Sequence, residues 1–187
     1  APFPRIIKSH EWCNKKYERV VYIVRNPKDV LISYYYFLKN GRKENVGDFS
    51  SFIRNKYYGV PAWCWHVSEW SKRWNVVVVY EDLLVDVKRN LKKILSYLKV
   101  DVDDCIIDSA IKQSSLDRMQ QLERSDSGWK SKHRLDQNFL FVDGQKNELN
   151  LFDKKDKKYL LDQIKKYELD LLLEKFNYVD ELQATKI

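Results

Sequence analysis

A lysine and a histidine stand two residues apart near the start of the sequence, in Lys8-Ser9-His10. They end a β-branched run that predicts a strand from Arg5 to Ser9. Residues two apart in an extended segment project to the same side. A histidine placed there can take a proton from a hydroxyl, while the lysine neutralises charge on an anionic group in transfer. The alternative is that both are ordinary surface residues, and the tripeptide alone does not decide between these interpretations.

A second group of chemically useful residues follows the apolar run Val20–Val24. Arg25 ends this run, and Asn26-Pro27 has the form of a helix start, with an Asn cap and Pro at the first position. A helix N-terminus beside an arginine binds anions through free backbone N–H groups, the helix dipole and the guanidinium group. Ser33, about two turns into the helix, would add a hydroxyl to the same phosphate. On the alternative interpretation, Arg25 only pairs with Asp29, and Ser33 is an ordinary helix residue.

Both groups depend on strands that end at one edge of a sheet. β-branched runs predict strands over residues 5–9, 19–25 and 75–81, and the unbroken run at 20–24 favours a parallel strand covered on both faces. Helices are expected over residues 26–40, 48–57, 63–70, 91–98, 103–111 and 153–175, with a long loop over 120–151. This alternation predicts an α/β fold, with a parallel sheet flanked by helices and ligands beyond the carboxyl ends of its strands. His66 lies on an apolar helix face and is interpreted as a packed histidine, not a catalytic one.

Composition excludes several classes of protein. The 187 residues carry a net charge of +7, and because the basic residues are spread along the chain, a small anionic ligand is favoured over nucleic acid. The three cysteines Cys13, Cys64 and Cys105 are widely spaced, which argues against disulfides or a zinc site and favours a reducing, cytoplasmic compartment. The longest apolar runs have the length of a strand, so no membrane span is expected.

The order of these segments resembles the soluble sulfotransferases that use 3′-phosphoadenosine 5′-phosphosulfate. The resemblance rests first on Arg-Ile-Ile-Lys-Ser-His at 5–10 and on Val-Val-Tyr-Ile-Val-Arg-Asn-Pro-Lys-Asp-Val-Leu-Ile-Ser-Tyr-Tyr-Tyr-Phe at 20–37. Further motifs follow in the family's order: Tyr58-Gly59, Trp63-x-x-His66-Val67, Val79-Tyr80-Glu81-Asp82-Leu83 and Ser114-Ser115-Leu116-x-x-Met119. It implies a P-loop nucleotide-kinase-like sulfotransferase fold, as a single domain over residues 1–178 with a tail at 179–187.

The resemblance also implies a reaction and its catalytic residues. A sulfuryl group would pass from the donor nucleotide to a hydroxyl, or less often an amine, of a small-molecule acceptor. His10 would be the general base on the acceptor, and Lys8 would contact the transferring sulfuryl group. No residue cluster requires a metal.

For the donor nucleotide, the resemblance implies two sets of contacts. Arg25 and Ser33 would hold the 3′-phosphate. Tyr80 and Ser114 would line the adenine pocket, with Leu116 at a position where the family usually stacks an aromatic side chain.

Two family elements have no counterpart in the sequence. The first is the opening strand with its Lys-Ser-Gly-type loop, which wraps the 5′-phosphosulfate, and we expect it to precede Ala1 in the intact protein. The second is the Arg-Lys-Gly segment that closes over the 3′-phosphate, for which residues 141–145 are the nearest candidate and lack a basic pair. The alternative to an enzyme is therefore a non-catalytic nucleotide-binding or interaction module derived from a sulfotransferase.

Overall fold

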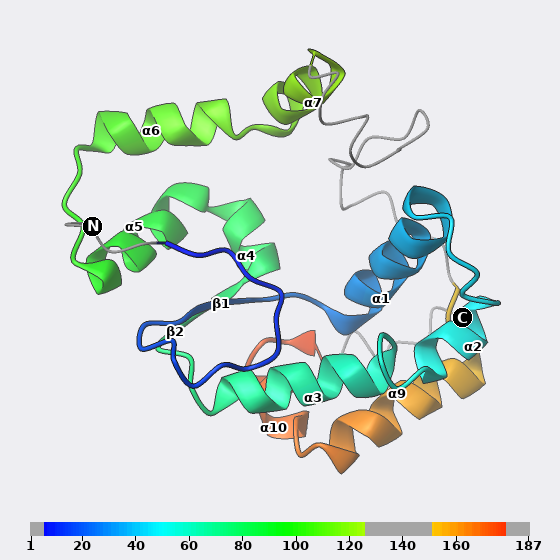
Figure 1. Cartoon of the computed structure of the whole chain (residues 1–187). Coiled ribbons are helices and arrows are strands. Elements are labelled where there is room, and N and C mark those ends of the chain that lie inside the picture. Colours follow the sequence, from blue (N-terminus) through cyan, green and yellow to red (C-terminus); the bar gives the residue numbers. More distant parts are fainter. Residues whose placement is uncertain (1–5, 126–150, 179–187) are drawn as a thin grey trace.

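The computed structural model describes residues 6–125 and 151–178. A two-stranded parallel sheet lies between two groups of helices, with α4 and α5 on one side and α3, α9 and α10 on the other (Figure 1). Strand β1 (Val21–Val24) pairs with β2 (Val76–Val79), so that Val21 lies beside Val76 and Val24 beside Val79. Both strands consist of β-branched and aromatic residues, which favour extended backbone. The parallel pairing of these two predicted strands is confirmed.

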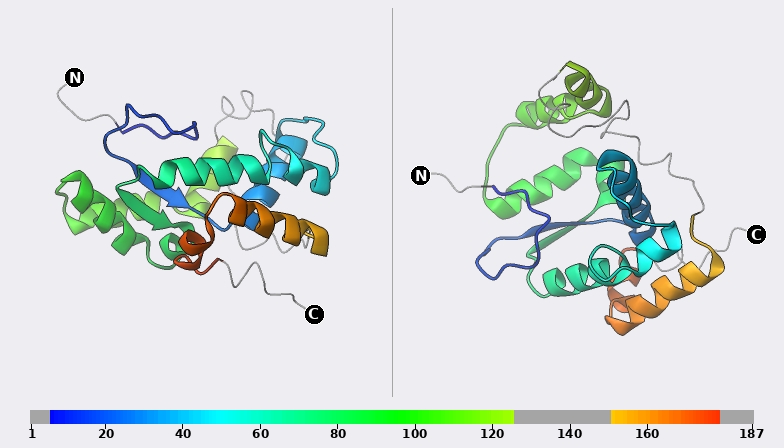
Figure 2. Two further views of the ribbon diagram at one scale, coloured as in Figure 1. Left: turned by 90° about the horizontal axis from the view of Figure 1, so that it is seen from below. Right: turned by 45° about the vertical axis from the view of Figure 1, so that its right-hand side comes forward.

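Helices fill the intervals between and after the strands. In chain order they are α1 (Pro27–Tyr36), the π-helical turn η1 (Phe37–Gly41), α2 (Phe49–Arg54), α3 (Val60–Ser71), α4 (Tyr80–Val85), α5 (Val87–Leu98), α6 (Asp104–Gln113), α7 (Leu116–Ser125), α9 (Lys154–Lys166) and α10 (Asp170–Glu174). In the right-hand view of Figure 2, α6 and α7 lie beyond α5 from the sheet, and Lys88 and Lys92 of α5 form ion pairs with Asp104 of α6. The main core lies where α1, α2 and α3 pack with α9 and α10, and its fully buried side chains include Leu31, Phe52, Ile53, Val60, Leu160 and Leu173.

The first predicted strand is wrong for the part that the structure describes. Residues Ile6 to Ser9 have no strand conformation, and Ile6 is 84% exposed. A strand requires a hydrogen-bonded neighbour, and the described sheet contains only β1 and β2. The expected cover on both faces of β1 is wrong as well, because Ile23 in the middle of the strand is 53% exposed.

Two predicted boundaries on the helices are also wrong. The single helix expected over 153–175 is divided, because Glu168 adopts a positive φ of 56° after α9 has ended. The backbone N–H of Leu169 then bonds to the carbonyl of Ile164, which turns Leu169 into the core. The loop expected from residue 120 begins later, because α7 continues to Ser125. The rest of that loop, and the tail at 179–187, lie outside the described residues.

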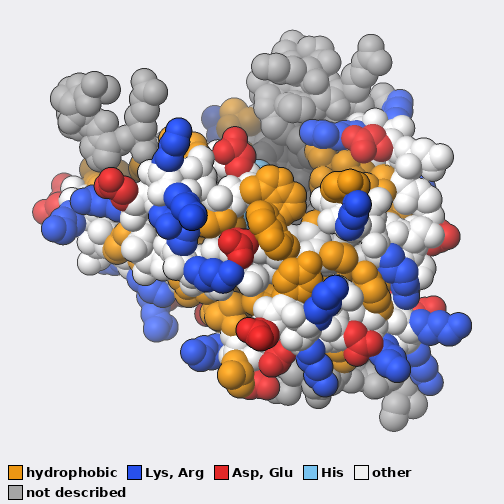
Figure 3. All heavy atoms as spheres, turned by 60° about the horizontal axis from the view of Figure 1, so that its bottom comes forward, with side chains coloured by type: hydrophobic (Ala, Val, Ile, Leu, Met, Phe, Trp, Pro, Cys, Tyr) orange, Lys and Arg blue, Asp and Glu red, His pale blue; other side chains and the backbone are white. Residues whose placement is uncertain are grey.

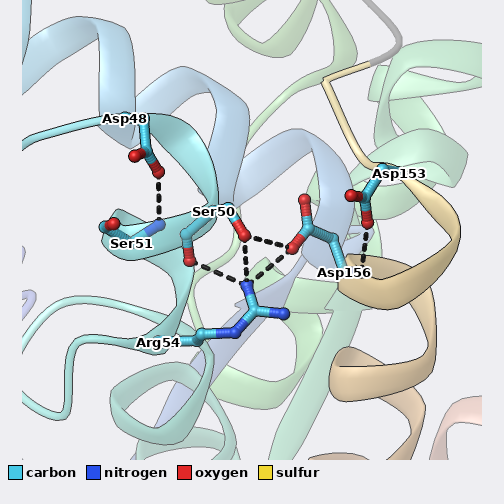
Figure 4. A network of polar contacts seen from close by, with 6 residues as sticks. All are labelled: Asp48, Ser50, Ser51, Arg54, Asp153 and Asp156. Carbon is cyan, nitrogen blue, oxygen red and sulfur yellow. Dashed lines mark hydrogen bonds and ion pairs between the residues drawn. The ribbon is translucent and has the colours of Figure 1, made fainter.

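A buried ion pair fixes α9 against α2 (Figure 4). Asp156, in the first turn of α9, is only 2% exposed, and its Oδ1 accepts hydrogen bonds from Ser50 Oγ at 2.7 Å and Arg54 Nη1 at 2.6 Å. The same Arg54 nitrogen donates to the Ser50 carbonyl at 2.8 Å. Asp153 caps α9 by accepting from the Asp156 backbone N–H. These contacts join segments about one hundred residues apart in the chain.

Replacing Asp156 with alanine is therefore expected to lower the free energy of unfolding by about 2 kcal/mol. The loss stays below the 3–5 kcal/mol typical of breaking a fully buried ion pair, because Arg54 can still reach water. The matched control is Asp162→Ala, at an exposed position on the same helix, where we expect a change within about 0.5 kcal/mol. Urea unfolding of both variants measures the difference, and equal effects would show that the ion pair does not stabilise the docking of α9.

Candidate functional site

The carboxyl end of β1 leads directly into the N-terminus of α1. Asn26 is 4% exposed and caps the helix, with its Oδ1 accepting from the Lys28 backbone N–H at 3.0 Å. Pro27 occupies the first helical position, where its missing N–H costs nothing. The helix start predicted from Asn26-Pro27 is confirmed. The positive end of the helix dipole therefore lies at the edge of the sheet.

Arg25 lies at this edge and contacts Tyr80, which follows β2. Its guanidinium carbon is 4.6 Å from the centroid of the Tyr80 ring, a cation–π geometry. Arg25 Nη2 is 3.7 Å from Asp29 Oδ2, which is long for a hydrogen-bonded ion pair. Among the described residues, Arg25 Nε is buried and has no hydrogen-bond partner. Both interpretations of Arg25 thus hold in part: it pairs with Asp29, yet the pairing leaves its guanidinium group incompletely bonded.

Asp29 is a weak counter-charge for Arg25. Burial raises the pKa of this half-buried carboxyl above its usual value, and the attraction of Arg25 offsets only part of that rise. The nearby negative charge of Glu81 also raises the pKa of Asp29. A second anion bound at Arg25 would raise the pKa of Asp29 further, so that Asp29 would take up a proton more readily than an ordinary aspartate does.

Glu81 joins the two strand ends. Its Oε1 accepts from the Asn26 backbone N–H at 3.1 Å, and its Oε2 accepts from the hydroxyl of Tyr178. The Tyr178 hydroxyl also lies 3.4 Å from the carbonyl of Val24, and Tyr178 is 2% exposed. Sequence reasoning missed the role of Tyr178, because 154 residues separate it from Val24 and no local pattern signals the contact.

Lys8 and His10 lie on the exposed segment that precedes β1. Ser9 Oγ accepts from the Glu11 backbone N–H at 3.0 Å, which fixes a turn around His10. Arg25 contacts Asp29 and Tyr80 at the sheet edge, whereas Lys8 and His10 lie on an exposed segment, and their expected catalytic role stays a prediction.

The remaining predicted donor contacts are also dispersed. Ser33 is half-buried on α1, on the helix that Arg25 precedes. Ser114 ends α6, where its hydroxyl donates to the Ala110 carbonyl at 2.9 Å, and Leu116 begins α7. Figure 1 shows α6 and α7 away from the sheet, whereas Tyr80 begins α4 directly after β2. The segment 141–145 lies outside the described residues.

His66 of α3 is half-buried, as expected of a packed histidine. It lies between β1 and the segment that precedes β1. Its Nδ1 lies 3.0 Å from the Tyr22 hydroxyl and its Nε2 lies 3.1 Å from the Glu11 carbonyl. Burial is the main influence on His66 and lowers its pKa, the Glu11 carbonyl opposes this, and the nearby His10 adds a smaller lowering effect. Neutral His66 is therefore the form that the fold favours.

Because the pKa of His66 is lower in the folded protein than in the unfolded chain, the free energy of unfolding should depend on pH. In the unfolded chain the pKa of His66 is about 6.5, so below that pH the unfolded state binds more protons than the folded one. Stability is thus fully present above about pH 6.5 and falls as the pH drops, by at most about 1.4 kcal/mol per pH unit from this group. The comparison is urea unfolding at pH 7.5 and 5.5 for the parent and His66→Gln. The loss on acidification should be smaller in the variant, and an equal loss would contradict the buried neutral histidine.

The described surface is mixed in character. Figure 3 shows one face, on which hydrophobic side chains lie near the centre and Lys and Arg side chains are scattered among uncharged and acidic ones. Within residues 6–125 and 151–178, no group of three or more His, Cys, Asp or Glu side chains is arranged to hold a metal ion. The helices described for these residues are too short or too polar to cross a membrane.

A parallel sheet flanked by helices, with an arginine at a strand end and a capped helix N-terminus beside it, defines an α/β domain. The family model described as "Sulfotransferase domain" matches residues 1–139, and the chain belongs to this family. Sulfotransferase 1A1 of Mus musculus is 33% identical over 137 residues, covering 65% of this chain and 47% of that protein. Human Sulfotransferase 1C2 is 27% identical over 153 residues, covering 73% and 51%. The chain thus spans about half the length of the curated relatives it matches.

Solved structures support the same fold. The crystal structure of mouse sulfotransferase SULT7A1 complexed with PAP superposes with a TM-score of 0.62 at 23% identity, covering 81% of this chain and 59% of that one. Retinol dehydratase in complex with androsterone and inactive cofactor PAP gives 0.64 at 20% identity, covering 81% and 48%. The predicted sulfotransferase α/β fold is confirmed.

Proposed function

We propose that the protein transfers a sulfuryl group from 3′-phosphoadenosine 5′-phosphosulfate to a hydroxyl, or less often an amine, of a small-molecule acceptor. The observation that carries this proposal is the arrangement of Arg25 with its incompletely bonded guanidinium group, the N-terminus of α1 and Tyr80. Family membership supports it, and both solved neighbours are described as complexes with PAP, the 3′-phosphoadenosine 5′-phosphate product.

The residues at the sheet edge fit such a nucleotide. Arg25 offers a partly exposed guanidinium group whose contact with Asp29 is long, which suits a doubly charged phosphate. The N-terminus of α1 and the Ser33 hydroxyl would complete the 3′-phosphate contacts. Tyr80, Ser114 and Leu116 would line the adenine pocket, and for Ser114 and Leu116 this requires α6 and α7 to approach the sheet.

The catalytic work would belong to His10 and Lys8. His10 would accept the acceptor's hydroxyl proton as the acceptor oxygen attacks, and the Lys8 ammonium group would stabilise negative charge near the sulfuryl oxygens. When bound, the donor supplies the activated sulfuryl group, and its nucleotide leaves as 3′-phosphoadenosine 5′-phosphate. Most of the rate enhancement would come from holding the two reactants in line, because the transfer needs no covalent protein intermediate.

A second candidate is a non-catalytic nucleotide-binding or interaction module. It is favoured by the exposed position of Lys8 and His10, on a segment that forms no strand among residues 6–10. Nucleic acid is a poorer ligand on either proposal, because the basic side chains are dispersed in sequence and across the face in Figure 3. The unpaired Cys13, Cys64 and Cys105 are in keeping with a cytoplasmic location.

Calorimetric titration with 3′-phosphoadenosine 5′-phosphate and with adenosine 5′-phosphate tests the donor site, using the protein at its full natural length. The first nucleotide is expected to bind at least about 30-fold more tightly, because only it carries the 3′-phosphate that Arg25 would bind. Equal affinity for both nucleotides would refute the assignment of the Arg25 group to the 3′-phosphate.

Ser33→Ala is expected to weaken binding of 3′-phosphoadenosine 5′-phosphate by about fivefold, or about 1 kcal/mol, because a neutral hydroxyl donates one hydrogen bond. The matched control is Ser96→Ala, at an exposed position on α5, which should leave the dissociation constant unchanged. Calorimetry measures the dissociation constant of both variants. If Ser33→Ala binds the nucleotide as tightly as the control does, Ser33 is not part of the site.

A further inference from the structure

Two side chains of α3 hold the backbone immediately after His10. The carbonyl of Glu11 lies 3.1 Å from His66 Nε2 and accepts from Trp70 Nε1 at 3.2 Å. His66 and Trp70 are one helical turn apart, so they present their ring nitrogens to the same point. From this convergence, and resting on the proposed function, we infer that His66 and Trp70 are positioning residues that hold the general base His10 in place.

The contact of His66 Nε2 with the Glu11 carbonyl favours one neutral tautomer. A carbonyl oxygen only accepts, so Nε2 must carry the hydrogen that points to Glu11. Nδ1 is then an acceptor, and the Tyr22 hydroxyl donates to it at 3.0 Å. Tyr22 remains a donor, because burial raises its pKa far above the usual value. Trp70 Nε1 also lies 3.2 Å from His66 Nε2, but since both nitrogens carry hydrogens, its hydrogen bond goes to Glu11.

Aromatic packing fixes the next residue to the same helix. The Trp12 ring meets the Trp65 ring edge-on, with centroids 4.5 Å apart, and lies 6.2 Å from the His66 ring. On the other side of His10, Ser9 Oγ accepts from the Glu11 backbone N–H. His10 itself is exposed, yet the next residue, Glu11, is bonded at both its backbone N–H and its carbonyl. Such a side chain stays available to an acceptor while its backbone is held.

Tyr22 extends this connection into the sheet. It belongs to β1, the strand that ends at Arg25, and its hydroxyl fixes the His66 ring. The His66 imidazole ring therefore links this strand to the segment that carries His10. Loss of that ring should displace His10 without altering Arg25, and a displacement of about 1 Å can reduce a catalytic rate about a hundredfold.

The test compares His66→Ala, His66→Gln, Trp70→Phe and the control Asp156→Ala, which lowers stability far from this contact. In sulfuryl transfer by the full-length protein, His66→Ala is expected to lower kcat by about tenfold to a hundredfold with the KM for the donor unchanged. His66→Gln retains an N–H donor and should recover most of kcat, and Trp70→Phe should lose several-fold. Asp156→Ala, assayed where it is folded, should retain the parent kcat.

A second readout does not depend on turnover. Amide hydrogen exchange in residues 6–17 should accelerate by about tenfold in His66→Ala and Trp70→Phe, and not in Asp156→Ala. If the parent protein lacks activity, the proposed function fails while this exchange experiment still tests the positioning. The inference is overturned if exchange in residues 6–17 is the same in His66→Ala as in the parent. It is also overturned if kcat falls no more in His66→Ala than in Asp156→Ala.

Discussion

His10→Ala is expected to lower the turnover number for sulfuryl transfer by about 10²- to 10⁴-fold, the usual cost of removing a general base. An imidazole is suited to this task because it accepts a proton near neutral pH. The His10 side chain is exposed and does not pack in the core. Its loss should therefore leave both the stability of the fold and the affinity for 3′-phosphoadenosine 5′-phosphate nearly unchanged.

Steady-state kinetics at saturating donor, together with calorimetry of the nucleotide, separates these effects. The matched control is Lys16→Ala, which removes an exposed charged side chain from the same segment. A His10→Ala protein that is folded, saturated with donor and still within about tenfold of the parent turnover would remove His10 from the mechanism.

Arg25→Ala is expected to raise the dissociation constant of 3′-phosphoadenosine 5′-phosphate by about 30- to 1,000-fold, which corresponds to about 2–4 kcal/mol. A guanidinium group binds phosphate through two parallel hydrogen bonds, and the helix N-terminus alone cannot replace them. Arg25→Lys should restore only part of the affinity, because an ammonium group keeps the charge and loses the fork geometry.

Calorimetry on the three proteins measures this series, with Arg89→Ala on α5 as the exposed control. Arg25 also stacks on Tyr80, so the thermal midpoint of each variant must show that the protein is folded at the temperature of titration. An unchanged dissociation constant in folded Arg25→Ala would show that the phosphate binds elsewhere.

Local sequence patterns predicted the elements that are fixed by their own residues. The unbroken β-branched runs at 20–24 and 76–79 became the two paired strands, and Asn26-Pro27 started a helix as expected. The predictions that failed depend on neighbours that a local pattern does not contain. Ile6 and Ile7 have the residue types of a strand, but in the described sheet no strand pairs with them. Glu168 lies within a helical pattern, yet it adopts a positive φ because Leu169 is buried in the core.

The candidate site shows the same division. Resemblance to the family placed Arg25 and Tyr80 in one nucleotide site, and the structure brings these residues, 55 positions apart in the sequence, into contact. The contacts of Glu81 with Asn26 and Tyr178, and of His66 with Glu11, arise from packing between distant segments. Hydrophobic periodicity places His66 on the buried face of α3, but it cannot identify the carbonyl that the imidazole bonds.

Transfer of labelled sulfuryl from 3′-phosphoadenosine 5′-[³⁵S]phosphosulfate to a simple phenol, by the protein at its full natural length, tests the central claim most directly. We expect a labelled sulfate ester that accumulates with time in a one-to-one ratio with 3′-phosphoadenosine 5′-phosphate, and that forms at least about a hundredfold more slowly with His10→Ala. A protein that binds 3′-phosphoadenosine 5′-phosphate but forms no labelled product with phenol, alcohol or amine acceptors would contradict the claim, and it would establish the non-catalytic binding module instead.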